Sequence, residues 1–213
     1  LFDPLLETDV LAQRFPRGSL PCVSLGDTVA VLEPSGRFTL WSLRNGERLL
    51  EQNLPPIEHL THFVVLRDRE RWLLLTQIAE PVAPDPSRPR VSALPLDHWS
   101  IHGPAFAFDR ATGKPLWTTT LETHAVQAAQ PAESPVLMLA SRVQNLGGVE
   151  QRPGEFSKFQ VSVLDKRHGR VLSLESSTRP ERSIFTNIRP NFADKTIDVQ
   201  IDRDLHRLSF EPK

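Results

Sequence analysis

The segment Ala79–Gly103 carries the side chains best suited to chemistry or recognition. It reads AEPVAPDPSRPRVSALPLDHWSIHG and ends with Asp97, His98, Trp99 and His102. The two histidines are four residues apart, a spacing that would place both imidazole rings on the same side of a helix. A metal site would also need a third ligand from another part of the chain. Two further interpretations remain: Trp99 anchors the segment on the protein body with the histidines at the surface, or it contacts a partner from a proline-stiffened loop.

Other signals for catalysis or metal binding are weak in this sequence. There is no nucleophile elbow, phosphate-binding loop or paired-carboxylate motif. The remaining histidines have no partner at ligand spacing and are interpreted as surface or satisfied polar groups. We therefore predict no catalytic residue, no metal ligand and no cofactor. These histidines are His59, His62, His124, His168 and His206.

Composition excludes several classes of protein. Lys and Arg number 25 against 26 Asp and Glu among 213 residues, so no field of one sign favours nucleic acid or an anionic membrane surface. Cys22 is the single cysteine, which excludes an intrachain disulfide and an iron–sulfur cluster. No run of about 18 apolar residues predicts a membrane-spanning helix. Because the chain begins at Leu1 rather than Met, we expect a processed protein or one domain of a longer chain.

Three stretches of the chain share one pattern when they are aligned on Gly46, Gly113 and Gly169. They read FTLWSLRNGERLL, AFAFDRATGKPLW and VSVLDKRHGRVLS. Each has an apolar run, a polar turn that ends in glycine and a leucine three residues after that glycine. Self-similarity at intervals of several tens of residues is typical of repeat architectures.

A tight turn between two strands explains the shared residues. Asp109 and Asp165 stand four residues before glycine, where a short carboxylate accepts hydrogen bonds from turn amides. Glycine supplies a backbone conformation that is costly for other residues. The first stretch has Ser42 in place of the aspartate, so its turn signal is weaker. We therefore predict a β-hairpin in each of the three repeats.

Further apolar runs give each repeat up to four strands. TVAVLE, WLLLTQI and PVLMLASRV lie upstream of the three hairpins, HFVVL, AVQAA and IFTNI lie between repeats, and TIDVQIDRDLHRLSF forms a fourth, incomplete repeat. Four-stranded antiparallel units in tandem build a β-propeller. The sequence therefore predicts an all-β propeller or partial propeller of about four blades, with a sandwich of short strands as the alternative.

The repeats are longer than compact blades. From Gly46 to Gly113 is 67 residues and from Gly113 to Gly169 is 56, whereas a compact blade needs about 40–50. The excess falls between the second and third strands, at residues 78–103 and about 143–157. Successive turns of an antiparallel meander alternate between the two edges of the sheet. Both insertions should therefore emerge on one face, and the Asp–Gly turns on the other.

The N-terminal segment is predicted to be a short helix. DPLLETDVLAQRFP offers Asp3 as a cap, Pro4 at the first helical position and Pro16 as a stop. The alternative makes this segment the outer strand of the last blade, which would close the ring. The predicted division is residues 1–17 as a helix or linker and residues 18–213 as the repeat domain.

The hairpins resemble the quinoprotein-like propeller repeat of bacterial proteins, whose usual form is an apolar strand, Asp, a turn with Thr-Gly, a basic residue and Leu-Trp. FAFDRATGKPLW matches nearly throughout, VSVLDKRHGRVLS lacks the Thr and Trp, and LWSLRNGERLL lacks the Asp and Trp. The resemblance covers about residues 20–210. It implies a propeller fold, Trp117 docked between neighbouring blades, and a periplasmic or extracytoplasmic location.

Enzymes of that family carry a quinone cofactor, a calcium or lanthanide ion and often two adjacent cysteines. This chain has one cysteine and about half the usual number of blades, so it is similar to the non-catalytic branch, which includes a lipoprotein assisting outer-membrane protein assembly. We expect a binding or scaffold module whose loop face contacts another protein, another domain of a longer chain, or a second copy that completes the ring. The alternative is a fragment of a quinone-dependent dehydrogenase or of a propeller hydrolase.

Overall fold

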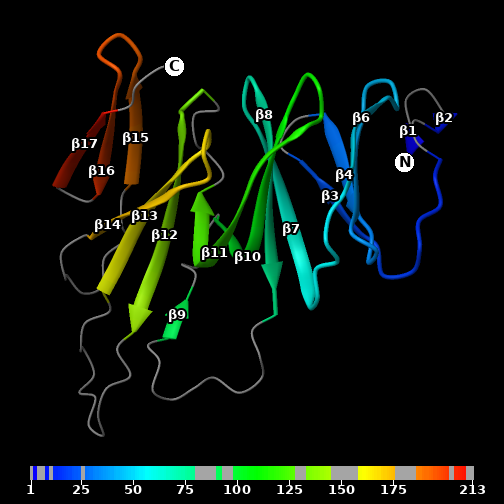
Figure 1. Ribbon diagram of the computed structural model, residues 1–213, viewed down its shortest axis with the longest axis horizontal. Helices are drawn as coiled ribbons and strands as arrows, with labels where there is room; N and C mark the ends of the chain where they lie inside the picture. The colour runs from blue at the N-terminus through cyan, green and yellow to red at the C-terminus, as the bar shows by residue number, and fades with distance from the viewer. Residues whose placement is uncertain are drawn as a thin grey trace, which may run out of the picture. The chain divides into compact units, whose positions relative to one another are not determined.

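The computed structural model is all-β in the part of the chain that it describes. The chain forms two compact units, residues 1–79 with 103–120 and residues 80–102 with 121–213. Two long strands, β10 (His98–Asp109) and β11 (Pro115–Gln127), are labelled in Figure 1, and each contains residues of both units. The described residues are 2–3, 8–9, 12–24, 27–79, 90–92, 98–127, 133–144, 158–175, 186–201 and 204–209.

The first sheet is an antiparallel meander in chain order, β3-β4-β5-β6. Its second strand is buried along its whole length, because Ala30 and Leu32 lie in one apolar cluster while Val29 and Val31 lie in another, with Trp41. A continuous apolar run such as TVAVL is what a strand covered on both faces requires. The bounds are β3 (Leu20–Val23), β4 (Thr28–Leu32), β5 (Arg37–Ser42) and β6 (Arg48–Asn53).

The second sheet of the first unit joins β7 (Leu60–Arg67), β8 (Arg71–Ile78), β10 and β11 as successive neighbours. Its first and third turns meet at one edge, because the Arg110 amide donates a hydrogen bond to the Glu70 carbonyl at 2.7 Å. The Arg110 guanidinium also lies 5.5 Å from the centre of the Trp72 ring, a cation–π distance. Two four-stranded meanders in tandem are the blade arrangement of a β-propeller.

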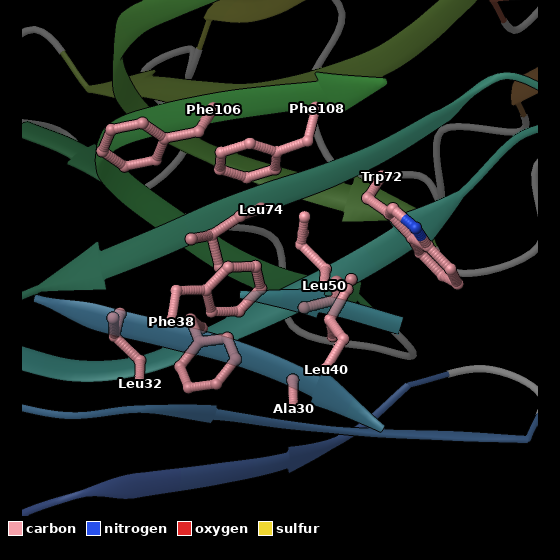
Figure 2. Close-up of a cluster of buried hydrophobic side chains, with 11 residues drawn as sticks. Ala30, Leu32, Phe38, Leu40, Leu50, Trp72, Leu74, Phe106 and Phe108 are labelled. Carbon is pink, nitrogen blue, oxygen red and sulfur yellow. The ribbon is translucent and has the colours of Figure 1, made fainter. Parts of the chain in front are cut away.

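Aromatic side chains join the first two sheets in one core (Figure 2). Phe38 on β5 stacks on Phe108 of β10 with ring centroids 5.8 Å apart, and meets Phe63 of β7 edge-on at 6.2 Å. Phe38 and Leu74 are fully buried. Each such side chain contributes about 1.5–3 kcal/mol on burial, so this core is what holds consecutive sheets together.

The second unit continues the meander with the last residues of β11. Ala125 and Val126 pair with Ala140 and Leu139 of β12, so β7 to β14 belong to one eight-stranded sheet, whose two four-stranded parts, sharing β11, are called the second and third sheets. The third sheet goes on through β12 (Val136–Gln144), β13 (Lys158–Asp165) and β14 (Val171–Glu175). A three-stranded sheet follows, made of β15 (Thr186–Asn191), β16 (Thr196–Ile201) and β17 (Asp204–Ser209).

The fold is thus all-β and of the β-propeller type, as the repeats predicted. The N-terminal segment differs from the predicted helix in the residues that are described. There, β1 (Phe2–Asp3) pairs with β2 (Thr8–Asp9) in an antiparallel ladder, while residues 1, 4–7, 10 and 11 lie outside the described part. Across the described residues, no helix has the length and apolarity needed to cross a membrane.

Candidate protein-binding surface

Two long connections lie in equivalent places of the second and third sheets. One joins β8 to β10 over residues 79–97, and the other joins β12 to β13 over residues 145–157. The first contains β9 (Arg90–Ser92), which pairs antiparallel with the end of β12: Val91 lies opposite Val143, and Arg90 opposite Gln144. The backbone therefore ties the first connection to the strand end from which the second one leaves.

Three of the four predicted contact residues, His98, Trp99 and His102, lie on a strand rather than in the loop that precedes it. β10 begins at His98, five residues before the end of the insertion that the sequence indicated. Trp99 and His102 are half-buried on this strand, while Asp97 and the side chain of His98 lie outside the described part. The spacing of four needs no helix, because alternate residues of a strand also return to one face.

His102 is joined by a second histidine that the sequence did not single out. The His102 imidazole shares a hydrogen bond with the Thr123 hydroxyl, Nδ1 to Oγ1, at 3.2 Å. The next residue, His124, is buried, and its Nδ1 lies 2.6 Å from the Glu122 carbonyl. A carbonyl oxygen only accepts, so Nδ1 carries the proton in this bond. The two histidines come from different strands, and their proximity left no signal in sequence spacing.

The environment of His124 favours its neutral form. Burial lowers its pKa below the ordinary 6.5, and repulsion from His102 lowers it further, whereas the bond to the Glu122 carbonyl acts in the opposite direction. His124 is therefore a buried and mainly neutral imidazole on the strand that also carries the partner of His102, Thr123. Within the described ranges, no three His, Cys, Asp or Glu side chains are placed to hold a metal ion.

The three Asp–Gly or Ser–Gly turns have the same backbone geometry. The amide of the glycine donates to the carbonyl four residues earlier in each: Gly46 to Ser42 at 3.0 Å, Gly113 to Asp109 at 2.8 Å, and Gly169 to Asp165 at 2.8 Å. The glycines have φ of 66°, 72° and 70°, which disfavours residues with a side chain.

The polar residue that starts each turn satisfies amides inside it. The Asp109 carboxylate accepts from both the hydroxyl and the amide of Thr112 at 2.7 Å, and the hydroxyl bond is the main reason why its pKa is lowered. Asp165 accepts from the Arg167 amide at 2.8 Å. Trp117, on the strand after the second turn, is half-buried. The hydrogen bonds of Asp109 and Asp165 close their turns, whereas the predicted docking of Trp117 between blades stays a prediction.

The chain can be compared with known proteins. No protein-family model matches it, and no curated protein does. It is similar to solved structures of Kuenenia stuttgartiensis hydrazine synthase (9% identity, TM-score 0.42, covering 83% of this chain and 47% of that chain) and of Comamonas testosteroni quinohemoprotein alcohol dehydrogenase (10%, 0.40, 87% and 34%). BamB from Moraxella catarrhalis is also similar (12%, 0.22, 89% and 73%).

The chain spans about half the length, or less, of the first two of these structures. At such low identities and TM-scores, the similarity carries no information on what this chain binds or does. The function must therefore be argued from its own residues.

Proposed function

We propose that this chain is a non-catalytic binding module that contacts another protein through the two long connections and the start of β10. The observation that supports this best is the pairing of β9 with β12, in which Val91 lies opposite Val143. The three ladder positions join the first connection, through β9, to the end of β12, the strand from which the second connection leaves. Long loops held by a rigid sheet are where binding residues concentrate in folded proteins.

The chemistry of the described residues nearby suits a protein partner. Trp99 offers a large apolar body with one N–H donor, the combination that anchors many protein interfaces. His102 is half-buried and already bonded to Thr123, so it is held in place without a metal. The partner is a separate protein, another domain of a longer chain, or a second copy of this chain, because each of these can present a surface of the same chemistry.

Site-specific photo-crosslinking tests the proposal. A photoreactive phenylalanine analogue is placed at Trp99, and at Thr112 in the turn between β10 and β11 as a control, in the cells that make the protein. We expect one defined crosslinked partner from position 99 and none from position 112. If both positions crosslink to the same set of proteins, or if neither position crosslinks, the proposed binding surface around Trp99 is contradicted.

A deletion of residues 82–89, which spares β9, provides a second measurement. If the connection is a contact surface, the shortened protein keeps its circular dichroism spectrum and binds the crosslinked partner more weakly. Unfolding of the shortened protein would show that the connection is structural. Mixing the purified protein with pyrroloquinoline quinone and calcium separates the enzyme alternative, because a spectral shift or a higher melting temperature would support a quinone-dependent dehydrogenase.

A further inference from the structure

A hollow of about 220 Å³ lies in the first unit, beside the turn between β4 and β5. It is several times larger than the volume of one water molecule, about 30 Å³. We call it the β4 hollow. Its walls combine apolar and polar surface: the lining includes Leu20, Leu32, Ile57 and Leu60, with Glu33 and His59.

Glu33 is a buried acid in this hollow, with a side chain only 9% exposed. Its two polar side-chain contacts among the described residues are weak. The Ser35 hydroxyl lies 3.5 Å from Oε2, and Nη1 of Arg37 lies 3.8 Å from Oε1, which is beyond hydrogen-bond length. A buried carboxylate is normally compensated by close donors, and among the residues that the structure describes Glu33 is short of them.

The neighbouring Arg37 does not donate a close hydrogen bond to Glu33, because its guanidinium is bonded to another carboxylate. Nε and Nη2 of Arg37 both lie 2.8 Å from Oε1 of Glu51, on the adjacent strand β6. A guanidinium that forks onto one carboxylate is held in that orientation. Glu33 therefore keeps capacity to accept hydrogen bonds from a ligand.

His59 adds a strained residue to the same hollow. Its φ is 56°, a left-handed conformation that residues other than glycine adopt rarely. The His59 carbonyl accepts a hydrogen bond from the Ala79 amide at 2.8 Å, which helps to fix this conformation. Backbone strain of this kind is concentrated at ligand-binding and active sites.

The composition of the hollow selects one class of ligand. A single carboxylate cannot supply the six or more oxygen ligands that calcium takes, and it repels anions. An ammonium or guanidinium group on an apolar stem suits both the carboxylate and the apolar side chains of the hollow. Its N–H groups donate hydrogen bonds to Glu33, while the stem lies against Leu32 and Ile57.

We propose that the β4 hollow binds an alkylammonium or guanidinium group, from a free amine or from a lysine or arginine side chain of another protein. The site goes beyond the function proposed above and does not depend on it. In its own sheet, the turn at residues 33–36 is the second connection, the place that the long insertions occupy in the second and third sheets.

Calorimetric titration with n-butylammonium tests the site, with n-butanol as the uncharged probe of the same shape. We expect saturable binding of butylammonium and none of butanol to the wild-type protein. Glu33→Gln should weaken the binding by about tenfold or more, because the amide keeps the shape and loses the charge. Glu47→Gln, which changes an exposed carboxylate of the same sheet, should leave the affinity unchanged.

A capped peptide with one lysine between glycines distinguishes the two sources of the cation. Binding of the peptide at least as tight as that of butylammonium supports a protein side chain, and tighter binding of butylammonium supports a free amine. Equal binding of butylammonium and butanol, equal binding to Glu33→Gln, or no binding overturns the proposal. The butanol comparison needs only the wild-type protein, so it decides the question even if the variant does not fold. Trp99 crosslinking should be unaffected by Glu33→Gln, which separates this site from the proposed interface.

Discussion

The side-chain amide of Gln52 on β6 donates a hydrogen bond to the main-chain carbonyl of Gly113, in the turn between β10 and β11, at 3.0 Å. The two residues belong to different sheets of the first unit. A Cβ added to Gly113 would lie 3.0 Å from Cδ1 of Leu50, also on β6. The turn that reverses one hairpin therefore also packs against the outer strand of the preceding sheet.

Replacing Gln52 should weaken the contact between the two sheets. We expect Gln52→Ala to lower the free energy of unfolding by about 1 kcal/mol, because a half-buried hydrogen bond is lost and the Gly113 carbonyl loses its donor. Urea denaturation followed by circular dichroism measures the change. The neighbouring exposed residue provides the control: Asn53→Ala should change the stability by less than half as much. Equal effects of the two substitutions would show that the bond is not formed in solution.

The hairpins were predictable because their determinants are local. Asp109 and Gly113 lie in one turn, and the bonds between them are formed within five residues. The fourth turn of this kind was not recognised. Asn191 takes the place of the aspartate, and its side chain accepts from the Asp194 amide at 3.1 Å, while Lys195 takes the place of the glycine with φ of 54°. A lysine gives no sign of a left-handed turn in a sequence.

The candidate site was less predictable because its contacts join distant parts of the chain. Trp99 and His102 could be selected by residue type, whereas the electrostatic effect of His102 on His124 arises from the pairing of strands that are distant in sequence. The β9 ladder joins Val91 to Val143 across about fifty residues. RVS is too short and too polar to indicate a strand, so the ladder that gathers the two connections had no sequence signal.

The buried imidazole of His124 should make stability depend on pH. Its pKa in the folded protein lies below the 6.5 of the unfolded chain, mainly because of burial. The unfolded chain therefore binds the proton first, and stability that is present above pH 6.5 is lost as the pH falls from 6.5 through the lower folded value. His124→Gln, which does not titrate and can still donate to the Glu122 carbonyl, should reduce this loss.

Urea denaturation at pH 7.5 and at two pH values below 6.5 measures the effect of His124→Gln. The difference in stability between wild type and variant should shift in favour of the variant as the pH falls. His62→Gln, a change of an exposed histidine in the first unit, is measured in the same way as a control for the general effect of replacing a histidine with glutamine. Parallel profiles for wild type and His124→Gln would mean that this histidine is not the titrating group.

Glycine at position 195 should stabilise the protein. The left-handed conformation destabilises a residue with a side chain by about 1–2 kcal/mol. Glycine avoids this strain but loses more backbone entropy on folding, which destabilises by about 0.5–1 kcal/mol. We therefore expect Lys195→Gly to raise the free energy of unfolding by about 0.5–1 kcal/mol. Lys114→Gly is the matched control, because in the described part only His59 and Lys195 combine a side chain with positive φ. That control should destabilise the protein, and stabilisation by both would point to a loss of charge instead.

Alanine at position 36 should be among the most damaging small substitutions in the first unit. Gly36 has φ of 90°, and an added Cβ would lie 2.0 Å from the carbonyl oxygen of Leu54, whose amide donates to the Gly36 carbonyl at 2.9 Å. The atoms of Leu54 that the added Cβ would meet belong to its backbone, so they cannot move aside as a flexible side chain could. We expect Gly36→Ala to lower the free energy of unfolding by more than about 3 kcal/mol. Alanine is strained at this φ, and its Cβ would also force the backbone of Leu54 away from residue 36.

Gly113→Ala provides the comparison for that substitution. Its φ of 72° is as unfavourable for alanine, but the contact at 3.0 Å is with the flexible end of the Leu50 side chain, which can shift. About 1–2 kcal/mol is therefore expected for Gly113→Ala, measured by urea denaturation under the same conditions. If the two variants lose equal stability, left-handed strain alone determines the cost, and the close approach of Gly36 to Leu54 does not persist in solution.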